Sequence, residues 1–194
     1  PAILRSPLNT ITEPLVIPDF FDFWAKHNHV CTGSVLIRSD IAKSAGGQRI
    51  DLRITQDLEY WAYLATFGKW GFIPKVLFVS DGGAVTKARG WLEKNKIRWA
   101  SAPPVNVWEE RIIKRVANPP PDGYLFARGC IASNLVYCMI ISSRNNLARK
   151  TVLEHYKYLP KGKLTFLYKF ASLTPVSWVA LCSLLRNREY KRTI

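Results

Sequence analysis

The sequence contains little of what metal centres and disulfide frameworks require. It has three histidines and four cysteines, which are Cys31, Cys130, Cys138 and Cys182. None of the cysteines forms a C-x-x-C pair, and no histidine stands at a zinc-finger spacing from them. This pattern is typical of reduced thiols in a cytosolic protein.

The sequence also lacks a signal-peptide pattern, an internal repeat and a low-complexity segment. It begins at Pro1, and we expect it to be part of a longer protein. Apolar and aromatic residues are plentiful: 48% of the residues are hydrophobic, and there are 7 Trp, 8 Tyr and 9 Phe. A chain of 194 residues with this composition can bury a sizeable core, so disorder is not expected.

Acidic residues are scarce, with 14 Asp and Glu against 28 Lys and Arg, a net charge of +14. The excess is concentrated in residues 104–194, which carry 15 basic and 5 acidic side chains. Such a segment attracts phosphates, nucleic acid or an anionic membrane face. The basic residues are scattered through apolar helical patterns, and no nucleic-acid module signature appears.

Hydrophobic periodicity and Gly or Pro breaks predict helices and strands along the chain. Two apolar runs predict strands at 30–38 and 71–81. Helical patterns are found at 20–28, 39–47, 90–101, 105–117, 124–148 and 150–159. A further helix is expected between Thr55, its predicted N-cap, and Gly68, which would end it.

Asp57 lies in the first turn of that last helix. The partial positive charge at a helix N-terminus stabilises a carboxylate there by about 0.3–1 kcal/mol. A structural acid and a catalytic base are therefore both consistent with the position. The residues that fall on one apolar face of this helix are Leu58, Trp61, Ala62 and Ala65.

The segment "NKIRW" combines two residue types that could contact different parts of one ligand. Arg98 can fork onto phosphate oxygens, and Trp99 offers a flat apolar face that packs on sugar rings. The alternative is an amphipathic helix with Trp99 in the core and Arg98 in water.

Two loops carry further candidates. In "CTGS", Gly33 permits close approach of a ligand, and Thr32 and Ser34 supply hydroxyls; the alternative is an ordinary turn. Asp81, before two glycines, could bind a metal or cap a turn.

Taken in order, the segments "CTGSVLIR", "AGG", "TQD", "GFIP" and "NKIRW" resemble the C-terminal half of the catalytic domain of family 2 glycosyltransferases, of the GT-A type. That family has a small-residue acceptor loop, a strand ending in Arg, a Gly-Gly stop and a T-E-D triplet whose Asp is the base. A Q-x-x-R-W helix follows about forty residues later. Here Gln56 replaces the Glu and Asn95 replaces the Gln, and the D-x-D motif is absent.

The resemblance covers roughly residues 28–101 and implies an α/β fold. It implies a partial GT-A domain, nucleotide-diphospho-sugar transferase-like and lacking its N-terminal half, at 1–103. A mostly α-helical basic extension would follow at 104–194. The chain would then be one part of an active enzyme.

The activity implied is that of an inverting, hexosyltransferase-like glycosyltransferase. Asp57 would be the general base, and Arg98 would bind the donor diphosphate. The residues that would line the acceptor site are Cys31, Thr32, Gly33, Ser34 and Trp99.

The resemblance also implies a divalent metal, Mg or Mn, with Asp81 as an extra ligand and the main ligands outside this chain. The partners implied are a nucleotide-sugar donor and a saccharide or lipid-linked acceptor, with no nucleic acid. Two alternatives stay open: a basic helical nucleic-acid-binding module, and a non-enzymatic membrane-associated scaffold.

The apolar stretch 164–185 is 22 residues long, nominally enough for a membrane span. Lys169 interrupts it early and Pro175 stands in its middle. We therefore predict an interfacial or packed helix pair broken near Pro175, and a cytoplasmic protein peripheral at the membrane face. The cluster that would hold it to anionic lipid is Arg186, Arg188, Lys191 and Arg192.

Overall fold

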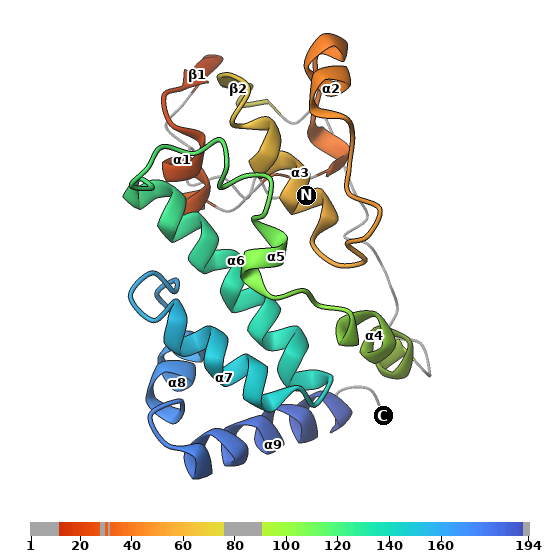
Figure 1. Ribbon diagram of the computed structural model, residues 1–194, viewed down its shortest axis with the longest axis vertical. Helices are drawn as coiled ribbons and strands as arrows, with labels where there is room; N and C mark the ends of the chain where they lie inside the picture. The colour runs from red at the N-terminus through yellow and green to blue at the C-terminus, as the bar shows by residue number, and fades with distance from the viewer. Residues whose placement is uncertain (1–11, 28–29, 31, 76–90, 192–194) are drawn as a thin grey trace. The chain divides into compact units, whose positions relative to one another are not determined.

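The computed structural model describes residues 12–27, 30, 32–75 and 91–191 (Figure 1). Within these residues the chain forms nine α-helices, one short 3₁₀ helix and a two-stranded sheet. The first helices are α1 (Phe20–His27), α2 (Ser39–Ala45), α3 (Gln56–Leu64), α4 (Trp91–Ala100) and α5 (Val105–Trp108). The later ones are α6 (Asp122–Ile141), α7 (Asn145–Glu154), α8 (Lys163–Ala171) and α9 (Pro175–Lys191). The remaining elements are β1 (Leu15–Ile17), η1 (Thr32–Ser34) and β2 (Trp70–Phe72).

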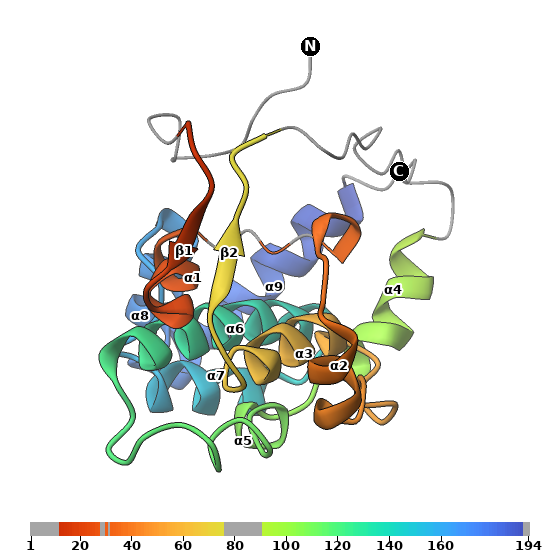
Figure 2. The same ribbon diagram turned by 90° about the horizontal axis from the view of Figure 1, so that it is seen from above.

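The predicted α/β fold is wrong, and no partial GT-A core is found in the part of the chain that the structure describes. The strands β1 and β2 have three residues each and pair antiparallel, with Leu15 opposite Phe72 (Figure 2). A parallel α/β sheet instead needs several strands joined by helical crossovers.

The predicted strand at 30–38 is one source of the error. Its described part forms η1 and then an irregular segment, in which Leu36 is 97% exposed. An apolar run becomes a strand when a neighbouring strand pairs with it and a core covers it. Leu36 has no such cover, so the run Val35–Ile37 did not specify a strand.

Other local predictions fared better. The helices at 20–28 and 90–101 are confirmed as α1 and α4. The single helix predicted at 105–117 is wrong, since α5 ends at Trp108 and turns follow. The break near Pro175 is confirmed: α8 ends at Ala171 and Pro175 opens α9, where its missing N–H costs nothing.

The chain divides into two compact units, each built from separate stretches of sequence. Unit 1 contains Pro1–Arg49, Gln56–Ala84 and Arg111–Ala127. Unit 2 contains Ile50–Thr55, Val85–Glu110 and Arg128–Ile194. The division predicted at residue 103 stays a prediction.

Unit 1 has an aromatic core around α1 and β2. The Phe20 ring packs edge-on to Trp24, with centroids 5.4 Å apart, and lies 4.5 Å from Trp70. Trp61 of α3 approaches the same Trp70 ring edge-on at 6.4 Å. Because these rings come from three elements, their burial joins α1, α3 and the sheet within one core.

Unit 2 contains α6 from Arg128 onward together with α7, α8 and α9. The last three of these helices contact one another (Figure 1). Its core includes three buried free thiols, Cys130, Cys138 and Cys182, as expected for reduced cysteines. Burial raises the pKa of both Cys138 and Cys182 to about 11, so these thiols stay protonated at neutral pH.

Gly129, inside α6, lies against the backbone of Tyr158. A Cβ at position 129 would overlap the Tyr158 carbonyl, which is backbone and cannot swing aside. Glycine therefore allows α6 to approach the segment after α7 closely.

We expect Gly129→Ala to destabilise the protein by about 1–3 kcal/mol through overpacking. This cost outweighs the gain of about 1 kcal/mol that alanine brings to an ordinary helix position. The control is Gly162→Ala, because Gly162 has open space around its Cβ position and an extended backbone. Urea unfolding of both variants measures the difference, and a Gly129→Ala protein as stable as the Gly162→Ala control would contradict the prediction.

Candidate functional site

Asp57 lies in the first turn of α3, as predicted, with its side chain half-buried. Its Oδ1 accepts a hydrogen bond from the backbone N–H of Leu58 at 2.9 Å. Its Oδ2 accepts one from the hydroxyl of Thr32 at a longer 3.3 Å. Two segments that are 25 positions apart in the sequence thus meet at this carboxylate.

The predicted acceptor loop supplies the Thr32 hydroxyl. Thr32, Gly33 and Ser34 form η1 and are all exposed. Cys31 lies outside the described residues. The loop is therefore open to solvent where it faces Asp57, which leaves its hydroxyls accessible to a ligand.

Glu59, which also lies in the first turn of α3, forms an ion pair with Arg111. The Glu59 side chain is 0% exposed. Arg111 Nε lies 2.6 Å from Glu59 Oε1, and its Nη2 lies 2.7 Å from Oε2. This is a bidentate contact in which both carboxylate oxygens are satisfied, the arrangement that makes a buried charge tolerable.

The same guanidinium also binds the end of α2. Its Nη1 donates to the carbonyl of Gly47 at 3.0 Å and more weakly to that of Ala45 at 3.4 Å. Carbonyls at a helix C-terminus lack intrahelical partners, and Gly46 ends α2 in the left-handed conformation (φ 69°). Arg111 therefore ties the "AGG" segment to the helix that carries Asp57.

The backbone just before α3 is strained. Thr55 has φ 59°, a conformation that β-branched residues rarely adopt. Thr55 directly precedes α3, at the predicted N-cap position, but its hydroxyl donates to the carbonyl of Ile54. The Thr55 carbonyl accepts a 3.4 Å hydrogen bond from Trp108 Nε1. Strain of this kind persists where surrounding contacts fix it, often at functional sites.

Gln56, which stands where the glycosyltransferase triplet has Glu, has an unusual side chain. Its Oε1 is buried and has no hydrogen-bond partner within the described residues. A buried acceptor without a partner is costly, and its burial places it out of reach of a ligand bound at the surface.

Arg98 and Trp99 lie on α4, as predicted, and belong to unit 2, whereas Thr32 and Asp57 belong to unit 1. Arg98 is exposed, and its Nε donates to the Arg53 carbonyl at 3.2 Å. Its two terminal nitrogens donate to no group in the part of the chain that the structure describes. They are therefore open to an external anion.

Trp99 is half-buried and packs edge-on against Tyr137 with centroids 5.9 Å apart. The end of α4 is further held by Arg144, whose Nη1 donates to the carbonyls of Ala100 and Ala102 at 2.8 and 2.7 Å. These contacts fix the helix end on which Arg98 stands. The Trp99 ring is only partly available to a sugar, since one edge is occupied by Tyr137.

No family model, no curated protein and no solved structure matches this chain. The resemblance to glycosyltransferases accordingly rests on the quoted motifs and on the contacts that unite three of them.

The described residues do not fit a metal site. Asp81, the predicted extra ligand, lies outside them. Among residues 12–27, 32–75 and 91–191 no three His, Cys, Asp or Glu side chains gather as a metal would need.

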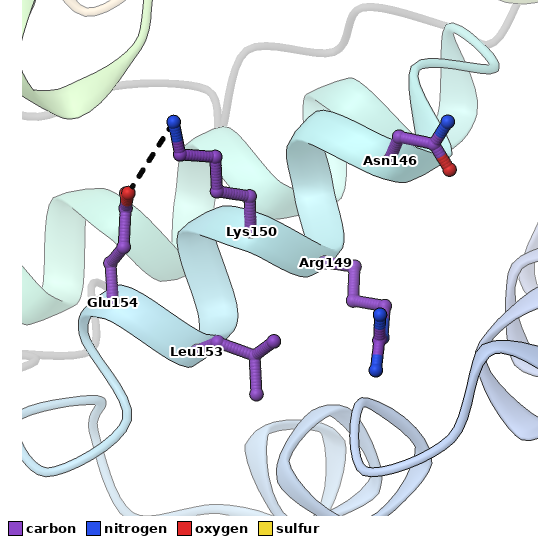
Figure 3. A pocket seen from close by; sticks show the side chains of 5 residues that line it. All are labelled: Asn146, Arg149, Lys150, Leu153 and Glu154. Atoms are coloured by element: carbon purple, nitrogen blue, oxygen red, sulfur yellow. Dashed lines mark ion pairs between the residues drawn. The ribbon is translucent and has the colours of Figure 1, made fainter.

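A shallow hollow of about 280 Å³ runs along α7, but it is lined by none of the predicted site residues (Figure 3). Lys150 and Glu154 form a 3.7 Å ion pair on one side of it. Arg149 and Leu153 point the other way. Its lining residues are Asn146, Arg149, Lys150, Leu153 and Glu154.

Sequence reasoning missed the residues that support the site: Glu59, Arg111 and Trp108. A signal existed for Glu59, because an acid beside the buried face of a helix requires a partner. The partner itself is 52 positions away, and nothing local to Arg111 distinguishes it from the other arginines of the basic half.

We expect Glu59→Gln to destabilise the protein by about 3–5 kcal/mol, because it leaves the Arg111 charge without its partner. Urea unfolding followed by tryptophan fluorescence measures the change. The control is Lys26→Gln, which removes an exposed ion pair with Asp22 and should cost less than about 1 kcal/mol. If the two substitutions lower the free energy of unfolding equally, the prediction for the Glu59–Arg111 pair is wrong.

Proposed function

We propose that this chain supplies the acceptor side and the general base of an inverting glycosyltransferase. The observation that supports it is the meeting of three motif segments at the start of α3. Thr32 of "CTGS" binds Asp57, and Arg111 links "AGG" to Glu59, two residues after Asp57. Motifs that could each be structural in isolation are thereby gathered around one half-buried carboxylate.

In the proposed reaction, the acceptor hydroxyl oxygen attacks the anomeric carbon of a nucleotide-activated sugar. A bond forms between that oxygen and the anomeric carbon as the bond from the anomeric carbon to the diphosphate breaks. The leaving nucleoside diphosphate takes the electron pair. The hydroxyl proton passes to Asp57, and a single displacement inverts the anomeric configuration.

The hydroxyl of Thr32 suits the acceptor side of this reaction. It donates a hydrogen bond to Asp57 Oδ2, while the backbone N–H of Leu58 donates to Oδ1, and the two bonds fix the orientation of the carboxylate.

On the donor side, we assign Arg98 to the diphosphate. Its exposed guanidinium presents two terminal nitrogens in a planar fork, the geometry that matches phosphate oxygens. Its charge would stabilise the leaving group as negative charge develops there. A divalent metal, Mg or Mn, belongs to the proposal through the resemblance, and the step described above does not depend on its placement.

We expect Asp57→Asn, in the enzyme that contains this chain, to keep the fold and to lower transfer by about 10²–10⁴-fold, because a general base contributes that much. Asn keeps the size of the side chain and can still accept from Thr32. Transfer is measured at saturating donor and acceptor, with circular dichroism as the check on folding.

Asp40→Asn is the matched control. Asp40 stands in the first turn of α2, is exposed and pairs with Arg38, so its loss should leave transfer unchanged. If Asp57→Asn lowers transfer by less than about tenfold, or no more than Asp40→Asn does, Asp57 is not the base.

We expect Arg98→Lys to weaken nucleoside diphosphate binding by about tenfold. Lysine keeps the charge but loses the planar fork, and one lost charge-assisted hydrogen bond is worth about 1.5 kcal/mol. Calorimetric titration with the nucleoside diphosphate measures the affinity. The same substitution at exposed Arg188 is the control, and equal affinities of the two variants would return Arg98 to a solvated helix face.

A further inference from the structure

The turn between α8 and α9 exposes a group of large apolar side chains. Phe166, Phe170, Leu173 and Val176 are 68%, 66%, 60% and 81% exposed. The first three recur at i, i+4 and i+7, so they form one stripe that runs along α8 into the turn. We call these four residues the apolar turn face.

The opposite side of the same two helices is firmly packed. Tyr168 and Ser172 are fully buried, and Trp178 is nearly so. Trp178 Nε1 donates to the Asn145 carbonyl at 2.8 Å, and Tyr168 packs edge-on against Trp178 at 6.1 Å. The apolar turn face is thus the outer side of an anchored element, and its exposure does not come from a lack of internal contacts.

The turn itself is tied to α7. Arg149 points from α7 away from the Lys150–Glu154 pair, and its Nε donates to the Ser172 carbonyl at 2.8 Å (Figure 3). Ser172 lies between Phe170 and Leu173. This bond therefore fixes the backbone from which the two apolar side chains project.

The charged side chains in the segment that carries this face all have one sign. Between Glu154 and Glu189 the sequence contains no acidic residue. The same interval contains six cations, which are Lys157, Lys161, Lys163, Lys169, Arg186 and Arg188. An exposed apolar face on a segment that carries cations and no acidic residue is complementary to a surface with an apolar interior and anionic headgroups.

We propose that the apolar turn face docks on an anionic lipid bilayer. Phe166, Phe170, Leu173 and Val176 enter the boundary between headgroups and acyl chains, and the flanking lysines contact the anionic headgroups. This goes beyond the proposed glycosyl transfer and does not rest on it.

The protein lies on the membrane through this face and does not span the bilayer with it. The helices α8 and α9 have 9 and 17 residues, and each buries one side inside unit 2. Among the described helices, α6 alone is long and apolar enough to cross a membrane, and 61% of its apolar window is buried within the protein. That burial fits a core helix.

A lipid surface suits this face better than a protein partner does. Protein interfaces place their apolar anchors in fully desolvated pockets and pair their charges with partner charges. Here the side chains project from α8, from the start of α9 and from the turn between them, and a protein partner would need to offer anions as well as a matching cavity. A bilayer supplies both anionic headgroups and an apolar interior, and it needs no cavity that matches the shape of the face.

The test uses sedimentation of the 194-residue chain with phosphatidylcholine vesicles, with and without phosphatidylglycerol. We expect the chain to bind the anionic vesicles at least tenfold more tightly than the neutral ones. Lys161→Gln with Lys163→Gln should weaken binding to the anionic vesicles by about fivefold for each charge, because a Lys near such a surface is worth about 1 kcal/mol.

The decisive variant is Phe170→Ser with Leu173→Ser, which should lower binding to anionic vesicles at least tenfold. Its matched control is Leu36→Ser with Ile50→Ser, because Leu36 and Ile50 are 97% and 100% exposed and lie outside α8 and α9. The control should bind vesicles as the parent does. All four substituted residues are exposed, and circular dichroism checks that both double variants are folded.

Three results would overturn the proposal: equal binding by the two double serine variants, equal binding to neutral and anionic vesicles, or no vesicle binding at all. In the last case, concentration-dependent self-association that Phe170→Ser with Leu173→Ser removes would assign the face to a second copy of the chain. The outcome is separable from that of the proposed transfer. The Asp57→Asn variant should bind vesicles normally, and the variant with Phe170→Ser and Leu173→Ser should still transfer sugar to a soluble acceptor.

Discussion

The buried pair of Glu59 and Arg111 is the interaction on which the candidate site depends. A fully buried carboxylate would be unstable alone, so Arg111 must approach it, and in doing so the guanidinium also reaches the carbonyls that end α2. One side chain therefore fixes the start of α3 relative to the end of α2. Asp57 lies two residues before Glu59 on the same helix, so this ion pair also determines where Asp57 lies. The position of the candidate site therefore depends on a buried charge that does not itself face the solvent.

The parts of the fold that were predictable are those whose signals are local. The αL glycine at position 46, the break at Pro175 and the first-turn position of Asp57 follow from backbone preferences that a few neighbouring residues determine. The fold class was not predictable in this way, because it depends on whether apolar runs find pairing partners. The run Val35–Ile37 finds no cover in the structure, whereas the short β1 at Leu15–Ile17 does find β2.

The same distinction holds for the site. Asp57, Thr32 and Arg98 were found because the resemblance supplied their spacing, and the meeting of Thr32 with Asp57 agrees with the roles predicted for them without testing those roles. Glu59, Arg111 and Trp108 were missed because each acts through a partner about fifty positions away. A buried carboxylate requires a cation beside it, but the sequence does not indicate which of the many arginines supplies that cation.

Many of those arginines serve the fold. The ones that donate to backbone carbonyls are Arg98, Arg111, Arg115, Arg144, Arg149 and Arg186. This use offers an explanation of the basic excess that requires no nucleic acid.

One of these arginines, Arg144, also changes the electrostatics at the C-terminal end of α4. The C-terminal end of a helix carries a partial negative charge of about half an electron, which would repel a phosphate bound close to Arg98. Arg144 donates to the carbonyl of Ala100, the last residue of α4, and its positive charge offsets this partial charge. The residue that holds the helix end in place therefore also favours an anion beside it.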